Sequence, residues 1–251
     1  MCLIALAWRV RVDVPLLLLA NRDEFRDRPW APATRWGDPP MQAGRDLRAG
    51  GTWLGLADDG RFAALTNVRR PGVRAGLRSR GEWVQRALAA PTMDRLQAQL
   101  REESAHYAAF NLLFGSLDAL YCWHSPTARM HRLAPGVHAL SNAGLNDPWP
   151  KVVAARARLD ALLARGDVHA DDACWEVLGS AQVPDGELPQ TGVGPDWERR
   201  LAPAVITGQT YGTLSRNLLR WHADGRVDFS ERALDADGRF LDHSSPKAQL
   251  P

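Results

Sequence analysis

The apolar residues near the start of this chain come in runs too short for helices of their own, which limits the fold to one that begins with strands. Residues 2–8 (CLIALAW) and 14–20 (VPLLLLA) are two such runs, joined by the polar stretch RVRVD. Short apolar runs bounded by polar residues are typical of buried strands. We therefore expect a hairpin in which Cys2 begins the first strand and the sequence ANRDEF follows the second.

Turn and cap signals predict the remaining elements. The steps Asp59-Gly60 and Asp224-Gly225 each separate two strand-like runs and predict hairpins. Ser79, in capping-box register with Glu82, predicts the start of a helix. Further strands are expected within 110–140, 202–208 and 211–234, and further helices at 93–103 and 171–181.

A longer amphipathic helix is expected after Asp147, its predicted cap, and it ends near Gly166. The Pro-rich stretch at residues 28–40 and the stretch at 182–203 indicate loops. Strands and helices thus come in alternating groups, which favours an α+β fold with antiparallel sheets and helices packed outside. At this length we expect a single domain over residues 1–240, followed by a C-terminal tail at 241–251.

Composition argues against several classes of function. The chain has 31 Lys and Arg against 29 Asp and Glu, a balance that does not favour nucleic acid as a partner. Its three cysteines form no CxxC pair and its seven histidines include no HExxH motif, so we expect no metal site. An odd cysteine count suits a reducing compartment, and we expect a cytoplasmic protein. Neither N-terminal apolar run is long enough to span a membrane.

Cys2 is a candidate nucleophile because removal of Met1 would make it the first residue. A thiol has an unperturbed pKa of about 8.5 and an α-amine one of about 7.7–8.0, so the amine is nearly matched as a base for its own thiol. Such a residue carries nucleophile and base together. The alternative is a small apolar residue at the start of a buried strand, which is the commoner role of a lone cysteine.

Charged residues after the second expected strand favour the catalytic interpretation. A hairpin brings the end of its second strand beside the start of its first, so we expect Asp23 close to Cys2, where it could hold the α-amine. Arg22 or Arg26 would add positive potential that favours the thiolate. The alternative is a solvated charged turn.

Two asparagines and a basic stretch are further candidates. Asn67 and Asn142 each stand where an apolar strand gives way to a Gly/Pro loop, and an amide there can donate to a developing oxyanion, worth about 2.7–4 kcal/mol. Either could instead satisfy its own turn. An acid-free stretch could bind a carboxylate or phosphate of a ligand, or be solvated, through Arg69, Arg70, Arg74, Arg78 and Arg80.

The sequence resembles the NRDE family, also called the transport and Golgi organization protein 2 family. The resemblance rests on ANRDEF after an N-terminal MC, followed in order by GGTWLGL, LTNVRRPG, LSNAGLNDPWPK and YGTLSR. It covers the chain from Cys2 to about Gly238. It implies a four-layer αββα sandwich of the N-terminal nucleophile (Ntn) hydrolase type, with two mostly antiparallel sheets between helical layers.

The same resemblance implies roles for individual residues. In related cysteine-dependent hydrolases, which cleave amides, the first residue is the nucleophile, an aspartate holds its amine, and two asparagines line the oxyanion site. Cys2 and Asp23 match the first two of these, and Asn67 and Asn142 match the asparagines. Asn21, Arg69, Arg70 and Arg216 are expected to contact the ligand.

The arginines that support the thiol in those hydrolases match less well. The hydrolases have an arginine where this chain has Ala20, and Arg22 is the candidate substitute. The family usually reads YGTRS near the C-terminus, whereas Leu214 replaces that arginine here. Because residues i and i+2 of a strand share a face, Arg216 is expected to restore the charge from the same side.

Two functions are therefore expected. The first is hydrolysis of a C–N amide bond in a small, partly apolar substrate, without a cofactor. The second follows from the family's links to haem trafficking and to lipid or acyl-CoA metabolism: a non-enzymatic carrier for haem or an acyl-CoA-like ligand, with the ten tryptophans supplying flat apolar surface. A metabolite-binding domain with a decayed active site is a third alternative.

Overall fold

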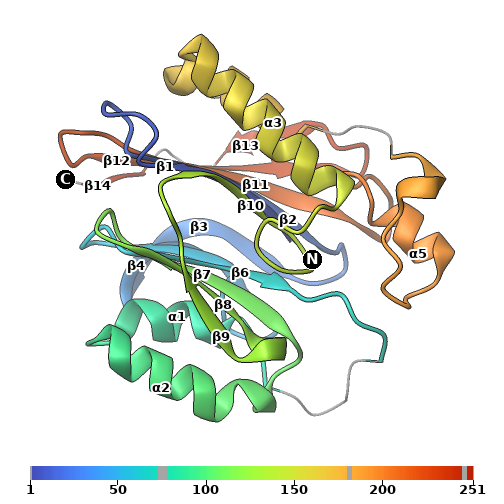
Figure 1. The fold of residues 1–251 in the computed structure, drawn as a ribbon, viewed down its shortest axis with the longest axis horizontal. Coiled ribbons are helices and arrows are strands. Elements are labelled where there is room, and N and C mark those ends of the chain that lie inside the picture. Colours follow the sequence, from blue (N-terminus) through green and yellow to red (C-terminus); the bar gives the residue numbers. More distant parts are fainter. Residues whose placement is uncertain (1, 73–77, 180–182, 245–247, 251) are drawn as a thin grey trace. The chain divides into compact units, whose positions relative to one another are not determined.

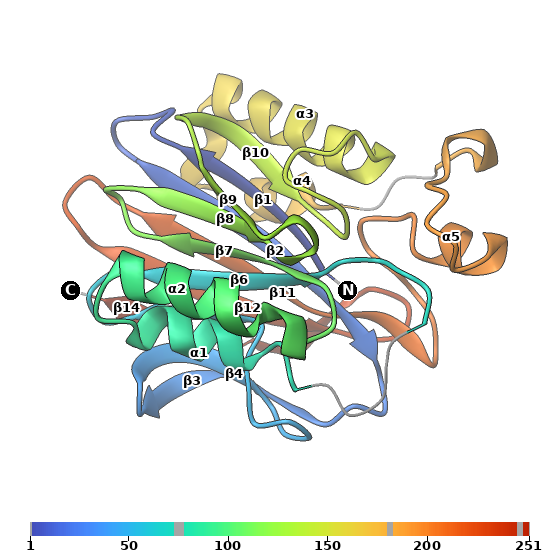
Figure 2. The same ribbon diagram turned by 60° about the horizontal axis from the view of Figure 1, so that its bottom comes forward.

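The computed structural model describes residues 2–72, 78–179, 183–244 and 248–250. The chain divides into two compact units, one made of Met1–Asp27 with Pro135–Pro251 and the other of Arg28–Ala134. Each unit consists of an antiparallel sheet with helices (Figures 1 and 2). The expected α+β class, with two antiparallel sheets and helices, is confirmed, whereas the four-layer order and the one-domain boundary stay predictions.

The sheet of the first unit contains both N-terminal strands in its interior. Among the described residues its order is β10-β1-β2-β11-β12-β13, and β14 also pairs with β12. The bounds are β1 Cys2–Trp8, β2 Leu16–Phe25, β10 Gly136–Leu140, β11 Tyr211–Trp221, β12 Val227–Leu234, β13 Phe240–Ser244 and β14 Ala248–Leu250. The last two strands occupy the expected tail, of which residues 245–247 and 251 lie outside the described residues.

The N-terminal hairpin is confirmed, with Cys2 of β1 opposite Arg22 of β2. The sequence ANRDEF does not follow the second strand, as we expected, but lies within it, because β2 continues to Phe25. This end of β2 has a partner on its other side, since β11 pairs with it and places Tyr211 opposite Phe25. The polar motif is therefore held in the sheet ladder.

Helices α3 (Pro150–Arg165) and α4 (Asp171–Val177) cover one face of this sheet (Figure 2). One buried core joins them to the strands through Leu3, Ala5, Leu17, Leu19, Leu159, Leu162 and Trp175. Helix α3 ends at Gly166 as expected, where a φ of 78° suits glycine. Its start was predicted wrongly: Trp149 is the N-cap, and Asp147 instead accepts a hydrogen bond from the Gly144 N–H at 2.7 Å.

The segment between α4 and β11 differs from expectation. Helix α5 (Pro195–Arg200) lies within the expected loop, and residues 202–208, expected as a strand, are irregular. Their backbone groups find partners without a strand ladder. The Thr213 N–H donates to the Ile206 carbonyl at 2.8 Å, and the Ile206 N–H donates to Thr213 Oγ1 at 2.9 Å.

The sheet of the second unit has the order β3-β4-β5-β6-β7-β8-β9 among the described residues. The bounds are β3 Trp30–Gly37, β4 Pro40–Asp46, β5 Leu54–Ala57, β6 Phe62–Asn67, β7 Phe110–Gly115, β8 Leu120–His124 and β9 Arg129–Arg132. The loop prediction for 28–40 was wrong. Pro32 is tolerated in β3 because this strand lies at the sheet edge and its pairing with β4 shifts register between Ala31 and Thr34.

Helices α1 (Glu82–Ala89) and α2 (Met93–Glu103) pack on one face of the second sheet (Figure 1). The capping box predicted for α1 is not formed: Gly81 is its N-cap, and Ser79 contributes only its carbonyl, which accepts from the Glu82 N–H at 3.2 Å. Short 3-10 helices occur at Ser104–His106, Ser125–Thr127, Asp167–His169 and Asp185–Glu187. None of the helices in the described part of the chain is both long and apolar enough to cross a membrane.

Leu159 tests the assignment of the core between α3 and the sheet. Its side chain is fully buried there, so Leu159→Ala is expected to lower the free energy of unfolding by about 2–5 kcal/mol. Urea denaturation followed by tryptophan fluorescence measures the change. Asp160→Ala is the control, since Asp160 is exposed on the same helix and should change stability by less than about 0.5 kcal/mol. Equal losses in the two variants would contradict the assignment.

Candidate active site

Cys2 begins β1 and lies directly opposite Arg22 of β2. Leu3 and Ala5 pack into the helix-covered core, so Cys2, one residue earlier, presents its side chain to the other face of the sheet. Directly opposite residues of an antiparallel pair share a face. Arg22, only 4% exposed, therefore lies on the face of the half-buried thiol.

Asp23 contacts the thiol through its backbone, whose N–H donates a hydrogen bond to the sulfur of Cys2. Its side chain is 1% exposed, and Oδ1 accepts a hydrogen bond from Thr213 Oγ1 at 2.7 Å. Thr213 lies opposite Asp23 on β11. The structure thus brings Cys2, Arg22 and Asp23 together.

The surroundings of the Cys2 thiol disfavour the thiolate overall. Burial raises the pKa of Cys2 above its usual value, and the negative charge of Asp23 raises it further. The positive charge of Arg22 and the hydrogen bond from the Asp23 backbone lower the pKa, but the net shift is upward. At neutral pH this thiol therefore needs a base to become a nucleophile.

Asn142 flanks Cys2 from the other side. Ile4 lies opposite Leu140 in the antiparallel pair of β1 and β10, so extending this register by two residues sets Asn142 opposite Cys2. Ser141 links the two, because its hydroxyl donates to the Cys2 carbonyl at 3.4 Å and lies 3.3 Å from Asn142 Oδ1. Asn142 is buried at this strand end.

Asn21 and Arg216 lie on the opposite face from the thiol. They are directly opposite each other, and Arg216 Nε donates to Asn21 Oδ1 at 3.1 Å. The Asn21 amide also donates to the carbonyls of Ala204, at 2.7 Å, and of Leu178, at 3.3 Å, while Arg216 donates to the Trp175 carbonyl. Burial lowers the pKa of Arg216 to about 10. These two residues join the end of α4 and the segment before β11 to the sheet.

The expected placement of Arg216 on the side of the thiol is wrong for a definite reason. Thr213 lies opposite Asp23 but Ser215 lies opposite Arg22, so Leu214 is an extra residue in β11. This one-residue bulge turns Arg216 to the helix-covered face. Without it, the alternation used for the prediction would have been correct.

The sequence prediction missed Ser141 and Thr213. Both stand inside the matching motifs LSNAGLNDPWPK and YGTLSR, next to residues that were predicted, but a hydroxyl residue in a motif does not indicate by itself which group it contacts. The contacts follow from the strand register, which the sequence pattern does not fix beyond the hairpin.

The remaining candidates belong to the second unit. Asn67 ends β6, opposite Phe110 of β7. Arg69 is buried and Arg70 exposed. Arg74 lies outside the described residues. Arg78 forms ion pairs with Glu82 and Glu103.

In the described ranges, no three His, Cys, Asp or Glu side chains lie close enough together to hold a metal ion. All three cysteines are free thiols.

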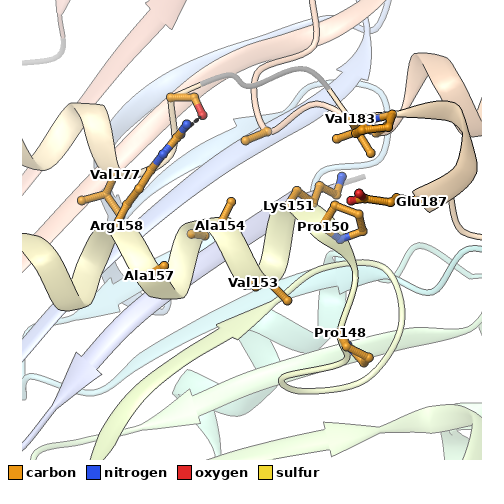
Figure 3. Close-up of a pocket in the computed structure, with 15 residues that line it drawn as sticks. Pro148, Pro150, Lys151, Val153, Ala154, Ala157, Arg158, Val177, Val183 and Glu187 are labelled. Carbon is orange, nitrogen blue, oxygen red and sulfur yellow. Dashed lines mark hydrogen bonds between the residues drawn. The ribbon is translucent and has the colours of Figure 1, made fainter.

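A groove along α3 is a separate feature of the first unit (Figure 3). This α3 groove has a volume of about 590 Å³ and is lined mostly by apolar side chains, among them Val153, Ala154, Ala157, Val177, Val183 and Ala204. Two basic residues of α3 also line the groove. Lys151 donates to the Leu201 carbonyl at 3.0 Å, and Arg158 donates to the Gly179 carbonyl. Their backbone positions are seven helical steps apart, a rise of about 10.5 Å along the helix axis.

Comparison with known proteins identifies the family. A Caenorhabditis elegans N-acylethanolamine-hydrolyzing acid amidase (NAAA) ortholog is similar in structure, with a TM-score of 0.47 and 11% sequence identity over 87% of this chain and 92% of that one. The chain is 32% identical over 240 residues to the Transport and Golgi organization protein 2 homologs of Bos taurus and Homo sapiens, covering 87% of this chain and 86% of each relative. A Mus musculus homolog is 32% identical over 244 residues, with 88% of each chain covered.

The family model described as Transport and Golgi organisation 2 matches residues 1–236. The order of motifs in the sequence had predicted this membership. The chain belongs to the Transport and Golgi organisation 2 family.

Proposed function

We propose that this chain hydrolyses a C–N amide bond in a small, partly apolar substrate, with Cys2 as the nucleophile. The observation that carries the proposal is the placement of the half-buried thiol opposite the buried Arg22 and against the backbone of Asp23. A cysteine that only fills space needs no charged neighbours, and buried charges are costly. Free cysteines suit a reducing compartment such as the cytoplasm.

The first half of the reaction forms a thioester. Removal of Met1, which lies outside the described residues, would leave Cys2 with a free α-amine that takes the proton of its own thiol. The thiolate attacks the amide carbonyl carbon, and the carbonyl π electrons move to the oxygen, to which Asn142 is proposed to donate. The C–N bond then breaks, and the Cys2 ammonium protonates the leaving amine.

The second half releases the acid. The α-amine takes a proton from water, and the resulting hydroxide adds to the thioester carbonyl. The C–S bond breaks, the carboxylic acid leaves, and the thiolate is regenerated. Asp23 is proposed to hold the ammonium through its carboxylate, and Arg22 to stabilise the thiolate. No cofactor takes part in either half.

The α3 groove favours a second candidate function, the holding of an acyl-CoA-like ligand or haem. Its apolar walls suit an acyl chain or a flat ring, and Arg158 and Lys151 supply positive charge from two positions about two helical turns apart on α3. This function requires neither Cys2 nor a free α-amine. The two proposals therefore predict different responses to substitution.

Cys2→Ser is expected to lower amide turnover at least ~100-fold, because a hydroxyl is a much weaker nucleophile at neutral pH. A panel of N-acyl 4-nitroanilides of different chain length measures turnover by release of 4-nitroaniline. Cys122→Ala is the control, since burial raises the pKa of Cys122 to about 12. Unchanged turnover in Cys2→Ser would overturn the proposal, as would retention of Met1 in the intact mass of the active protein.

Asp23→Asn is expected to lower the pKa of the Cys2 thiol, and Arg22→Met to raise it, because the carboxylate opposes the thiolate and the guanidinium favours it. The alkylation rate of Cys2 by iodoacetamide against pH measures this, read from the tryptic peptide that ends at Arg9. The pH at which the alkylation rate is half-maximal should shift by at least ~0.5 unit in each variant, in opposite directions. The exposed Asp94→Asn is the control. Movement of both variants in the same direction would contradict the assigned charges.

Ala154→Trp tests the second candidate function by filling the α3 groove. Haem and palmitoyl-CoA are the probes, each titrated against the protein while its tryptophan fluorescence is followed. If the groove holds the ligand, Ala154→Trp should weaken binding at least ~10-fold, as expected for the loss of about 1.4 kcal/mol, whereas Cys2→Ala should leave it unchanged. Ala89→Trp, at an exposed position of α1, is the matched control. Binding that survives Ala154→Trp excludes the groove as the site.

A further inference from the structure

Thr213 is a fully buried residue whose hydroxyl donates its proton to the Asp23 carboxylate. Its Oγ1 accepts the Ile206 N–H at 2.9 Å, which fixes one direction of the oxygen. The hydroxyl proton is donated to Asp23 Oδ1 at 2.7 Å. The backbone holds the same pair together, because the Thr213 N–H donates to the Ile206 carbonyl at 2.8 Å.

The bulge at Leu214 is what brings this hydroxyl to Asp23 without disturbing Arg22. Thr213 lies opposite Asp23, and after the extra residue Ser215 lies opposite Arg22. The Ser215 hydroxyl is used elsewhere, since it donates to Glu231 at 2.9 Å. Bulges commonly re-aim a side chain next to an active site. Here the extra residue, Leu214, lies between Thr213, which binds the Asp23 carboxylate, and Ser215, which lies opposite Arg22.

We propose that Thr213 is a positioning residue of the candidate active site, which holds the Asp23 carboxylate in one orientation at the end of β2 that pairs with Cys2. The inference deepens the proposed function and rests on it for the role of Asp23 toward the amine of Cys2. A hydroxyl that donates to a carboxylate favours its ionised form. With Oδ1 held in this way, the carboxylate is also prevented from rotating.

A purely structural role for Thr213 makes a different prediction. If the hydroxyl served only to satisfy the Ile206 N–H, its loss would destabilise the fold but leave the titration of Cys2 unchanged. If it acts through Asp23, its loss lets the charged carboxylate rotate away, and the titration of Cys2 should move in the direction that Asp23→Asn moves it. The titration of the thiol therefore separates the two roles.

The experiment compares four variants by the pH of half-maximal alkylation of Cys2 with iodoacetamide. Thr213→Val keeps the shape and removes the hydroxyl, and Thr213→Ser keeps the hydroxyl. Asp23→Asn and the double variant Asp23→Asn/Thr213→Val complete a double-mutant cycle. Thr52→Val is the matched control, because Thr52 is also buried but donates to the backbone carbonyl of Leu54 at 3.1 Å.

We expect Thr213→Val to move the midpoint to lower pH by at least about half of the change in Asp23→Asn, and Thr213→Ser and Thr52→Val to keep the wild-type midpoint. The double variant should match Asp23→Asn alone. A wild-type midpoint in Thr213→Val, or full additivity in the double variant, overturns the inference. If Thr213→Val does not fold, Thr213→Ala against Thr213→Ser gives the same comparison.

The result is independent of turnover. A shifted midpoint in a protein that hydrolyses no amide would support the role of Thr213 and reject the proposed function. If turnover depends on Cys2 but Thr213→Val keeps the wild-type midpoint, the proposed function is supported and the role of Thr213 is rejected.

Discussion

The antiparallel pairing of β1 with β2 sets Cys2 opposite Arg22, and the candidate active site depends on this register. The register is fixed by residues that take no part in chemistry. Leu3 and Ala5 of β1 must enter the same core as Leu17 and Leu19 of β2, and a slip by one residue would turn one set to the wrong face. Each leucine removed from the core forfeits about 1.5–3 kcal/mol of burial. The hydrophobic effect therefore holds the thiol beside the guanidinium, although neither group contributes to it.

The bulge at Leu214 is a second constraint on the site. Whereas the pairing of β1 with β2 brings Arg22 to the thiol, the bulge keeps Arg216 away from it. Regular pairing would put Arg216 on the face of the thiol, where it would add a buried positive charge beside Arg22. The extra residue sends Arg216 to the other face, where Asn21 and the Trp175 carbonyl accept its hydrogen bonds. One residue of register thus decides whether an arginine belongs to the site or to the framework.

The parts of the molecule that the sequence predicted are those governed by local pattern. The hairpin of β1 and β2, the strands of 110–140 and the end of α3 at Gly166 follow from apolar runs and glycine. The errors arise where tertiary contacts replace local signals. β3 contains Pro32 but is stabilised as an edge strand, and residues 202–208 look like a strand but bond to Asn21 and Thr213 instead. For the site, Cys2, Arg22 and Asp23 were found together because a hairpin alone brings them close, whereas Thr213 depends on a long-range pairing.

The alternating faces of β2 explain why a polar motif stands in the interior of a sheet. Asn21 faces the helices, where its amide holds the Ala204 carbonyl. This anchors the segment that carries Ile206, whose N–H orients the Thr213 hydroxyl toward Asp23. Arg22, one residue along, faces the thiol directly. Residues of the motif therefore act on Cys2 in two ways: Arg22 lies directly across the strand pair, and Asn21 acts through the segment before β11. A substitution of Asn21 should therefore change the orientation of the Asp23 carboxylate, although Asn21 does not act on it directly.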